Sequence, residues 1–169
     1  MGPGVSISEG ELMDNLVALY TTTAGRISRK NWWIGVVGII VASIVLSIIL
    51  SLVGLNAAWA QLIVYVLLFY PNWCIGLKRR QDRDNNGMDF KILMGLSGLL
   101  TLVQALGIGV TMTDMGNGMM VAMPDMWMSI LYMLLGVFGI YMLVQLGFLK
   151  GTPGANSYGA DPHGYAAIA

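Results

Sequence analysis

The hydrophobic positions of this chain fall into four long runs, separated by short polar segments. The runs cover about residues 33–54, 59–77, 91–112 and 126–149, and the first, second and fourth contain no charged side chain. A helix rises about 1.5 Å per residue, so about 20 apolar residues cross a hydrocarbon core of about 30 Å. The pattern therefore predicts an all-α, polytopic membrane protein with four transmembrane helices.

Polar flanks divide the chain into an N-terminal segment (1–31), the four-helix transmembrane domain (32–150) and a tail (151–169). In the N-terminal segment, Ser8 and Glu11 have the spacing of a capping box. Apolar residues follow at helical spacing, namely Leu12, Met13, Leu16, Val17 and Tyr20. They predict a short amphipathic helix, which either lies in the headgroup plane or packs on the ends of the bundle. The tail is rich in Gly and Pro, which predicts an extended, exposed segment.

The basic residues set the orientation of the predicted bundle. They are Arg26, Arg29, Lys30, Lys78, Arg79, Arg80, Arg83, Lys91 and Lys150. With four spans, all of them lie on one side, whereas the opposite loops carry Asp114 and Asp125. Because basic loops stay in the cytoplasm, both the N- and C-termini are expected to be cytoplasmic.

Composition supports a lipid environment and narrows the function. The chain is 56% hydrophobic and only 11% charged, whereas soluble domains are about 25% charged. Its net charge of zero argues against nucleic-acid binding. Cys74 and His163 are the single cysteine and histidine, and we find no set of nucleophile, base or metal ligands. We therefore expect neither an enzyme nor a bound cofactor, and the spans lack the buried ionisable residue of a proton-coupled transporter.

Small residues recur every four positions in two of the predicted spans. One stripe comprises Gly35, Ser43, Ser47 and Ser51, and the other comprises Ser97, Thr101, Ala105 and Gly109. Small residues let helices approach closely in lipid, so both stripes are predicted helix contacts. The alternative is a polar path lined by hydroxyl groups.

Two other patterns suggest ion binding. A methionine-rich outer loop offers Met115, Met119, Met120 and Met123, whose thioethers suit Cu(I) but also serve as flexible apolar contacts. Residues 82–87 match the first half of a calcium loop, but Leu93 stands where the pattern needs a bidentate Glu. The basic loops either bind anionic headgroups or only set the topology.

Three separated motifs carry a family resemblance. They are GRISRKNWW at 25–33, KRRQDRDNNG at 78–87 and GTPGANSYGADP at 151–162. In this order they resemble the domain of unknown function 805 family of small bacterial inner-membrane proteins, which includes the YhaH-like proteins. The motif positions are Gly25, Arg26, Arg29, Lys78, Arg79, Asp82, Arg83, Gly87, Gly154, Asn156, Tyr158, Gly159, Asp161 and Pro162. Gln81, Asn86 and Met88 replace the family's usual histidine, serine and tryptophan.

The resemblance implies a four-span protein of the bacterial inner membrane and supplies no activity. Because all three motifs are expected on the cytoplasmic side, we predict that they fold together as one cap, with Asp82 and Asp161 available to pair with Arg26, Arg29 or Arg79. The first functional hypothesis is a non-enzymatic accessory or interaction protein, whose partners are the lipid bilayer and other membrane proteins or further copies of itself. The alternative is a small transporter or channel that handles Cu(I) through the methionine-rich loop.

Overall fold

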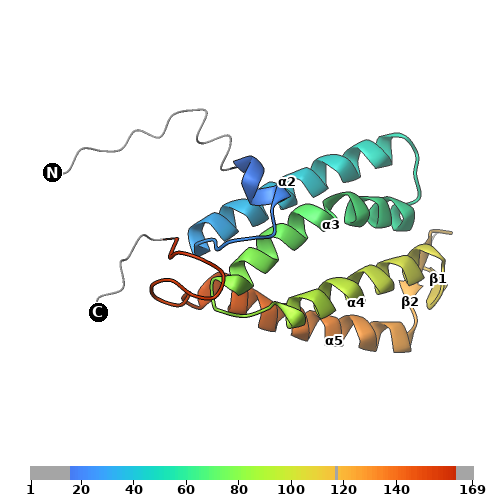
Figure 1. Cartoon of the computed structure of the whole chain (residues 1–169). Coiled ribbons are helices and arrows are strands. Elements are labelled where there is room, and N and C mark those ends of the chain that lie inside the picture. The colour runs from blue at the N-terminus through green and yellow to red at the C-terminus, as the bar shows by residue number, and fades with distance from the viewer. Residues whose placement is uncertain (1–15, 117, 163–169) are drawn as a thin grey trace.

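The computed structural model describes residues 16–116 and 118–162 and shows a mostly helical fold (Figure 1). Its helices are α2 (Arg29–Leu52), α3 (Ala57–Gln81), α4 (Met88–Ala105) and α5 (Met126–Leu143), and η1 (Val144–Phe148) continues α5 as a π-helix. Within the described residues, four helices are long and apolar enough to cross a membrane, when η1 is counted with α5. The predicted fold class is confirmed.

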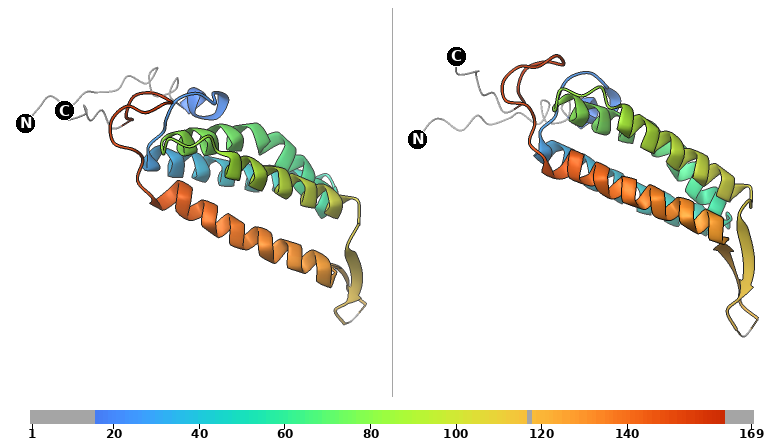
Figure 2. Two further views of the ribbon diagram at one scale, coloured as in Figure 1. Left: turned by 60° about the horizontal axis from the view of Figure 1, so that its bottom comes forward. Right: turned by 90° about the horizontal axis from the view of Figure 1, so that it is seen from below.

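The four helices run alternately up and down, so each end of the bundle collects a distinct set of connections (Figures 1 and 2). At one end lie the start of α2, the α3–α4 connection and the segment after η1. A small β-hairpin closes the other end, between α4 and α5. α3 packs along both α2 and α4, whereas α5 packs less closely against its neighbours.

The packed core lies toward the end of the bundle that is opposite the hairpin. Trp32, Ile75, Phe90 and Met142 are among its buried members. Much of the remaining helix surface is apolar and exposed, with about half of the Ile44 and Ile48 side chains accessible. Water would penalise such a surface, whereas the hydrocarbon core of a bilayer matches it.

Close approach between α3 and its neighbours depends on glycine. A methyl group on Gly76 would collide with the Phe90 ring of α4, and one on Gly35 would lie 3.2 Å from Ile75 of α3. The α2 stripe of small residues thus faces α3, and Ser43, Ser47 and Ser51 line a cavity with Ala60 and Gln61.

The α4 stripe follows the prediction only in part. Ser97 and Thr101 donate hydrogen bonds back to their own helix, to Leu93 O and Ser97 O at 2.8 Å. The residue that brings α4 close to α3 is Gly98, because a methyl group there would lie 2.9 Å from the Tyr65 ring. Close approach to α3 therefore occurs beside the stripe, whereas two stripe members are closely packed, since Ala105 is buried and a methyl group on Gly109 would lie 2.8 Å from Met128.

The helix boundaries differ from the hydropathy pattern at both ends of the α3–α4 connection. α3 continues to Gln81, past the predicted end at residue 77, so Lys78, Arg79 and Arg80 are helical and buried. Gly87 precedes α4 with a φ of 70°, a left-handed conformation that glycine adopts without strain. The central basic segment is therefore partly a buried helix end, not a solvated loop.

The predicted extension of the third span to residue 112 is wrong. α4 ends at Ala105, and Gly107 and Gly109 follow with φ values of 72° and 71° that stop the helix. The chain then forms β1 (Val110–Asp114), which pairs antiparallel with β2 (Met120–Pro124). Val110, Thr111 and Thr113 are β-branched, which favours this extended conformation.

Only part of the predicted N-terminal amphipathic helix lies within the described residues. Residues 16–21 are helical, and residues 1–15 lie outside the described part of the chain. Leu19 is buried, and the Tyr20 hydroxyl donates to Gly35 O at 3.2 Å. Burial raises the pKa of the Tyr20 phenol, which therefore stays neutral. The described turn thus packs against α2, as one of the two alternatives expected.

Candidate functional site at the cap

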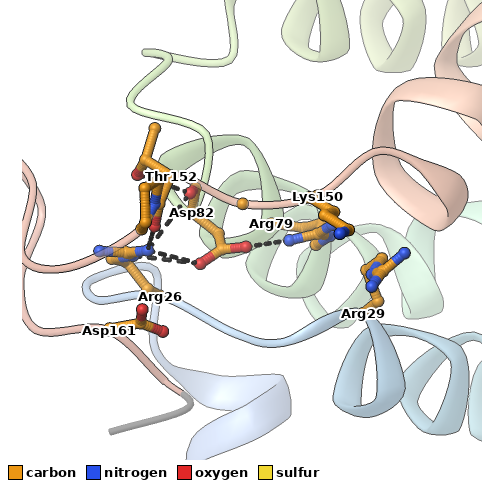
Figure 3. A pocket seen from close by; sticks show the side chains of 9 residues that line it. Arg26, Arg29, Arg79, Asp82, Lys150, Thr152 and Asp161 are labelled. Carbon is orange, nitrogen blue, oxygen red and sulfur yellow. Dashed lines mark hydrogen bonds and ion pairs between the residues drawn. The ribbon is translucent and has the colours of Figure 1, made fainter. Parts of the chain in front are cut away.

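The motifs at 25–33, 78–87 and 151–162 meet at the end of the bundle opposite the hairpin, and we call them together the cap (Figures 1 and 3). Asp82 lies at its centre between two arginines. Arg26 Nη2 lies 3.1 Å from Asp82 Oδ1, and Arg79 forms an ion pair with Asp82 Oδ2. These side chains are only 1% (Arg26), 0% (Arg79) and 3% (Asp82) exposed. Such burial requires that the charges be paired.

Arg26 ties the tail to the rest of the cap. Its Nε donates to Asp82 Oδ1 at 3.1 Å, and its Nη2 donates to Thr152 O at 2.6 Å. Its Nη1 donates to Gly154 O and, at 3.3 Å, to Gly159 O. A guanidinium group has five N–H donors in a fixed fork. The contacts of Arg26 therefore use each of its three nitrogens and join segments more than 120 residues apart.

Arg79 and Arg29 stabilise the end of η1. Arg79 Nε donates to Leu146 O at 2.7 Å, and its Nη2 donates to Leu149 O. Arg29 Nη1 donates to Phe148 O at 3.1 Å. The last carbonyls of a helix have no partner within the helix and carry partial negative charge. Arginine side chains from α2 and α3 supply these missing donors, which fixes the position of η1 in the bundle.

The tail in turn caps α3. Thr152 donates from both its backbone nitrogen and its hydroxyl to Asp82 O, at 2.9 and 3.1 Å, and Asn156 Nδ2 donates to Gln81 O at 2.9 Å. Gly151 permits this approach, because a Cβ there would meet the Asp82 carboxylate, with Oδ1 at 2.8 Å. The tail is therefore docked on the bundle, which confirms the predicted cap and shows that the prediction of an exposed tail from its Gly and Pro content is wrong.

A second set of polar contacts lies beside the first. Arg80 forms an ion pair with Asp89 at 2.8 Å and donates to Gln145 Oε1 at 3.0 Å. Arg83 donates to the same Gln145 oxygen. Lys78 Nζ donates to Ala18 O and Leu19 O at 2.6 and 2.8 Å, at the end of the N-terminal helical turn. The buried basic residues of α3 thus act as donors for chain ends around it.

The remaining motif residues differ in their roles: some form turns, some make hydrogen bonds, and Pro162 is exposed. Gly25, Gly87, Gly154 and Gly159 have positive φ values of 93°, 70°, 70° and 136°, which explains glycine at these turns. Asp161 Oδ2 accepts from Gly154 N at 3.1 Å, and Tyr158 N donates to Asn156 Oδ1 at 2.9 Å. Pro162 is exposed at the end of the described residues.

Sequence reasoning missed several residues of the cap, which are Thr152, Gly151, Gln145 and Asp89. Thr152 and Gly151 stand within a quoted motif, so the motif was a usable signal for them. Gln145 was visible only as an isolated amide in an apolar run. Asp89 lay just beyond the central motif and was identifiable only once α4 was placed beside Arg80.

The calcium interpretation finds no support in this geometry. The Asp82 carboxylate is occupied by two arginines, and Asp84 Oδ1 accepts from Ser157 N at 3.1 Å. Across residues 16–116 and 118–162, no cluster of three or more His, Cys, Asp or Glu side chains is placed to hold a metal ion.

The methionines of the predicted Cu(I) loop are distributed over the hairpin. Met123 pairs with Thr111, and Met120 pairs with Asp114. Successive strand residues point to opposite faces, so Met120 and Met123 lie on different faces. Met112, opposite Ala122, shares the face of Met120. Met115 and Met119 flank the turn, where Met115 N donates to Met119 O at 2.9 Å.

The surface of the cap contains a cavity of ≈ 320 Å³ (Figure 3). Arg26, Arg29, Arg79 and Lys150 line it together with Asp82 and Asp161, a formal surplus of two positive charges. Such a cavity can bind an anion or remain a solvated part of the cap.

Comparison with known proteins gives the family. Residues 20–160 match the family described as protein of unknown function (DUF805). The chain belongs to this family. The matched region of this DUF805 chain includes almost all of the cap and the four long helices. No curated protein and no solved structure matches the chain.

Proposed function

We propose that this DUF805 chain is an integral protein of the bacterial inner membrane that acts as a non-enzymatic accessory or interaction protein. The observation that carries this proposal is that the buried charged side chains of the cap bind other parts of the chain. Arg26, Arg79 and Asp82 are engaged with one another and with backbone carbonyls. Groups held in this way fix the ends of the chain on the bundle and are poorly placed to transfer protons or attack a substrate.

The same proposal places the cap in the cytoplasm. The basic residues lie at the ends of helices that meet at the cap, whereas Asp114 and Asp125 lie at the hairpin end. The positive-inside rule associates the basic end with the cytoplasm.

The surface of α5 supports a role in association with other helices. Val137 and Ile140 are 62% and 64% exposed, and a methyl group on Gly136 would meet nothing within 4 Å. A small residue on an uncovered helix face allows a second transmembrane helix to approach closely. We therefore expect α5 to contact a partner subunit or a second copy of the chain.

Native mass determination of the full chain in a gentle detergent tests this proposal. We expect a stoichiometric second polypeptide or a homo-oligomer. The Gly136→Leu variant is expected to dissociate it, because the added side chain separates the two helices. Gly95→Leu on α4, where a Cβ also meets nothing within 4 Å, is the matched control and is expected to leave it intact. A pure monomer for the unsubstituted chain would contradict the association.

One observation favours the alternative, a transporter or channel that handles Cu(I). Met112 and Met120 share one face of the hairpin, and both side chains are more than half exposed. Thioethers are soft ligands that suit Cu(I). Titration of the purified chain with Cu(I), together with copper flux into liposomes, separates this alternative from the accessory role.

A further inference from the structure

The cavity of the cap contains two cationic side chains that the cap itself leaves largely unused. Arg26 donates from all three of its nitrogens to the tail and to Asp82, and Arg79 donates to carbonyls and to Asp82. With the described residues, Arg29 makes one hydrogen bond, through Nη1 to Phe148 O. Lys150 is exposed and makes no hydrogen bond or ion pair with the described residues. Arg29 and Lys150 therefore retain donors for a ligand.

These two cations face the same space. Arg29, Arg79 and Lys150 all line the cavity, and Figure 3 shows them on the same side of Asp82. Arg79 is paired with Asp82, but Arg29 and Lys150 are like charges that repel one another across the cavity unless an anion lies between them. The two acidic residues of the cavity wall already have partners within the cap. Asp82 pairs with two arginines, and Asp161 accepts a hydrogen bond from Gly154 N. The cavity consequently favours a ligand with negative charge.

The side chains just before Lys150 in the chain, and the tryptophan packed on them, indicate the level of the cavity in the membrane. The Trp33 ring packs edge-on against Phe148 with centroids 5.9 Å apart, and Trp33 Nε1 donates to Gly147 O at 3.2 Å. Tryptophan prefers the level of the lipid headgroups. Phe148 and Leu149 are 59% and 37% exposed directly before Lys150. An apolar surface that ends in cations matches a lipid whose chains end in an anionic headgroup.

We propose that Arg29 and Lys150 bind the phosphate of an anionic phospholipid headgroup at the mouth of the cap cavity. Arg29, at the start of α2, supplies a planar guanidinium group whose N–H donors suit phosphate oxygens. Lys150, just after η1, supplies a positive point charge. The exposed Phe148 and Leu149 contact the first part of the acyl chains. The proposal rests on the membrane insertion proposed above, and it is independent of the accessory role.

Native mass spectrometry of the full chain in detergent, titrated with phosphatidylglycerol, tests this site. We expect the first phosphatidylglycerol to bind more tightly than phosphatidylcholine, whose headgroup has no net charge. A basic residue near a membrane surface contributes about 1 kcal/mol, which corresponds to about fivefold in affinity. Lys150→Gln is therefore expected to weaken the first binding event about fivefold, and Arg29→Gln with Lys150→Gln about 25-fold.

Lys30→Gln is the matched control, because Lys30 is an exposed cation next to Arg29 that does not line the cavity. It is expected to change the affinity less than twofold. Equal affinities for Lys150→Gln and the unsubstituted chain, or an equal loss in Lys30→Gln, would overturn the proposal. Arg29→Gln also removes a bond to Phe148 O, so its melting temperature is measured alongside. Lys150 has no such internal bond, and its variant tests the site even if Arg29→Gln unfolds.

Inorganic phosphate distinguishes a lipid from a soluble ligand. We expect phosphate alone at millimolar concentration to leave the bound phosphatidylglycerol in place. Full displacement of the lipid by phosphate would show a site for a soluble anion and overturn the lipid assignment. Failure of membrane insertion is distinguishable from both outcomes, because the chain would then stay soluble without detergent before any lipid is added.

Discussion

At the scale of single residues, Asp82 is the position on which the charge balance of the cap depends. Replacing it by Asn leaves Arg26 and Arg79 buried without a carboxylate. Breaking a buried ion pair by removing one partner costs about 3–5 kcal/mol. We therefore expect Asp82→Asn to lower the melting temperature of the detergent-solubilised chain strongly, as followed by loss of its size-exclusion peak after heating.

Asp89→Asn is the matched control for this substitution. Asp89 also pairs with an arginine, Arg80, but its side chain is 24% exposed. Water reaches the Asp89 carboxylate, and Arg80, although buried, keeps Gln145 Oε1 as an acceptor, so we expect a smaller loss than for Asp82→Asn. Equal losses for the two variants would show that the Asp82 ion pairs do not stabilise the cap more than a partly exposed pair does.

Gly151 tests the docking of the tail without a change of charge. Gly151→Ala places a methyl group against the Asp82 carboxylate, so the tail has to move from α3. We expect a loss of about 1–3 kcal/mol in stability, as for other overpacked sites. In Gly95→Ala, on α4, where a methyl group also meets nothing within 4 Å, helix propensity favours Ala by up to about 1 kcal/mol. Thermal melts of both variants check the difference, and a Gly151→Ala melt no lower than that of Gly95→Ala would contradict the docking.

Sequence motifs identified the charged residues of the cap but not most of their partners. Arg26, Arg79 and Asp82 all stand in motifs. Many of their partners are backbone carbonyls, such as Leu146 O and Thr152 O. Every residue has a carbonyl group, so nothing in the sequence marks which ones an arginine will reach. The composition of the cap was therefore predictable, whereas its hydrogen-bond pattern required the fold.

At the scale of elements, hydropathy located the helices but misplaced several of their ends. It ended the second helix before Lys78, because charge normally marks the limit of a span. In the structure Lys78, Arg79 and Arg80 continue α3, since carbonyls and carboxylates of other segments satisfy them. Hydropathy is averaged over a short window of sequence, so it contains no information on hydrogen-bond partners that lie far away in the chain.

The hairpin β1–β2 was the element that the sequence failed to predict, and it is expected to be the least stable one. All of its residues except Val110 are exposed, and the described residues contain no third strand. An isolated two-stranded hairpin is marginally stable. We expect the backbone amides of β1 and β2 to exchange with deuterium in detergent much faster than those at the buried end of α3, as measured by mass spectrometry. Comparable protection would indicate that another molecule covers the hairpin.

At the scale of the whole molecule, the fold has two chemically different ends joined by an apolar bundle. The cap end carries buried ion pairs and the cationic cavity, and the hairpin end carries exposed methionines. The number of long apolar helices and the end of the bundle at which each basic residue lies followed from sequence, because charge distribution is read along the chain. The docking of the tail also followed, since the three motifs predicted one cap, but its individual contacts did not, because they join residues about 130 positions apart.

The orientation of the two ends is testable with single cysteines. Cys74 is 0% exposed, so it contributes little background labelling. Met115→Cys, at the hairpin, and Ala155→Cys, in the tail, both replace exposed residues. In intact bacterial cells whose outer membrane has been made permeable, a membrane-impermeant maleimide is expected to label Met115→Cys but not Ala155→Cys. Inverted membrane vesicles provide the control, in which Ala155→Cys becomes the labelled position. The reverse pattern would place the cap outside the cell, where the positive-inside rule does not put nine basic residues.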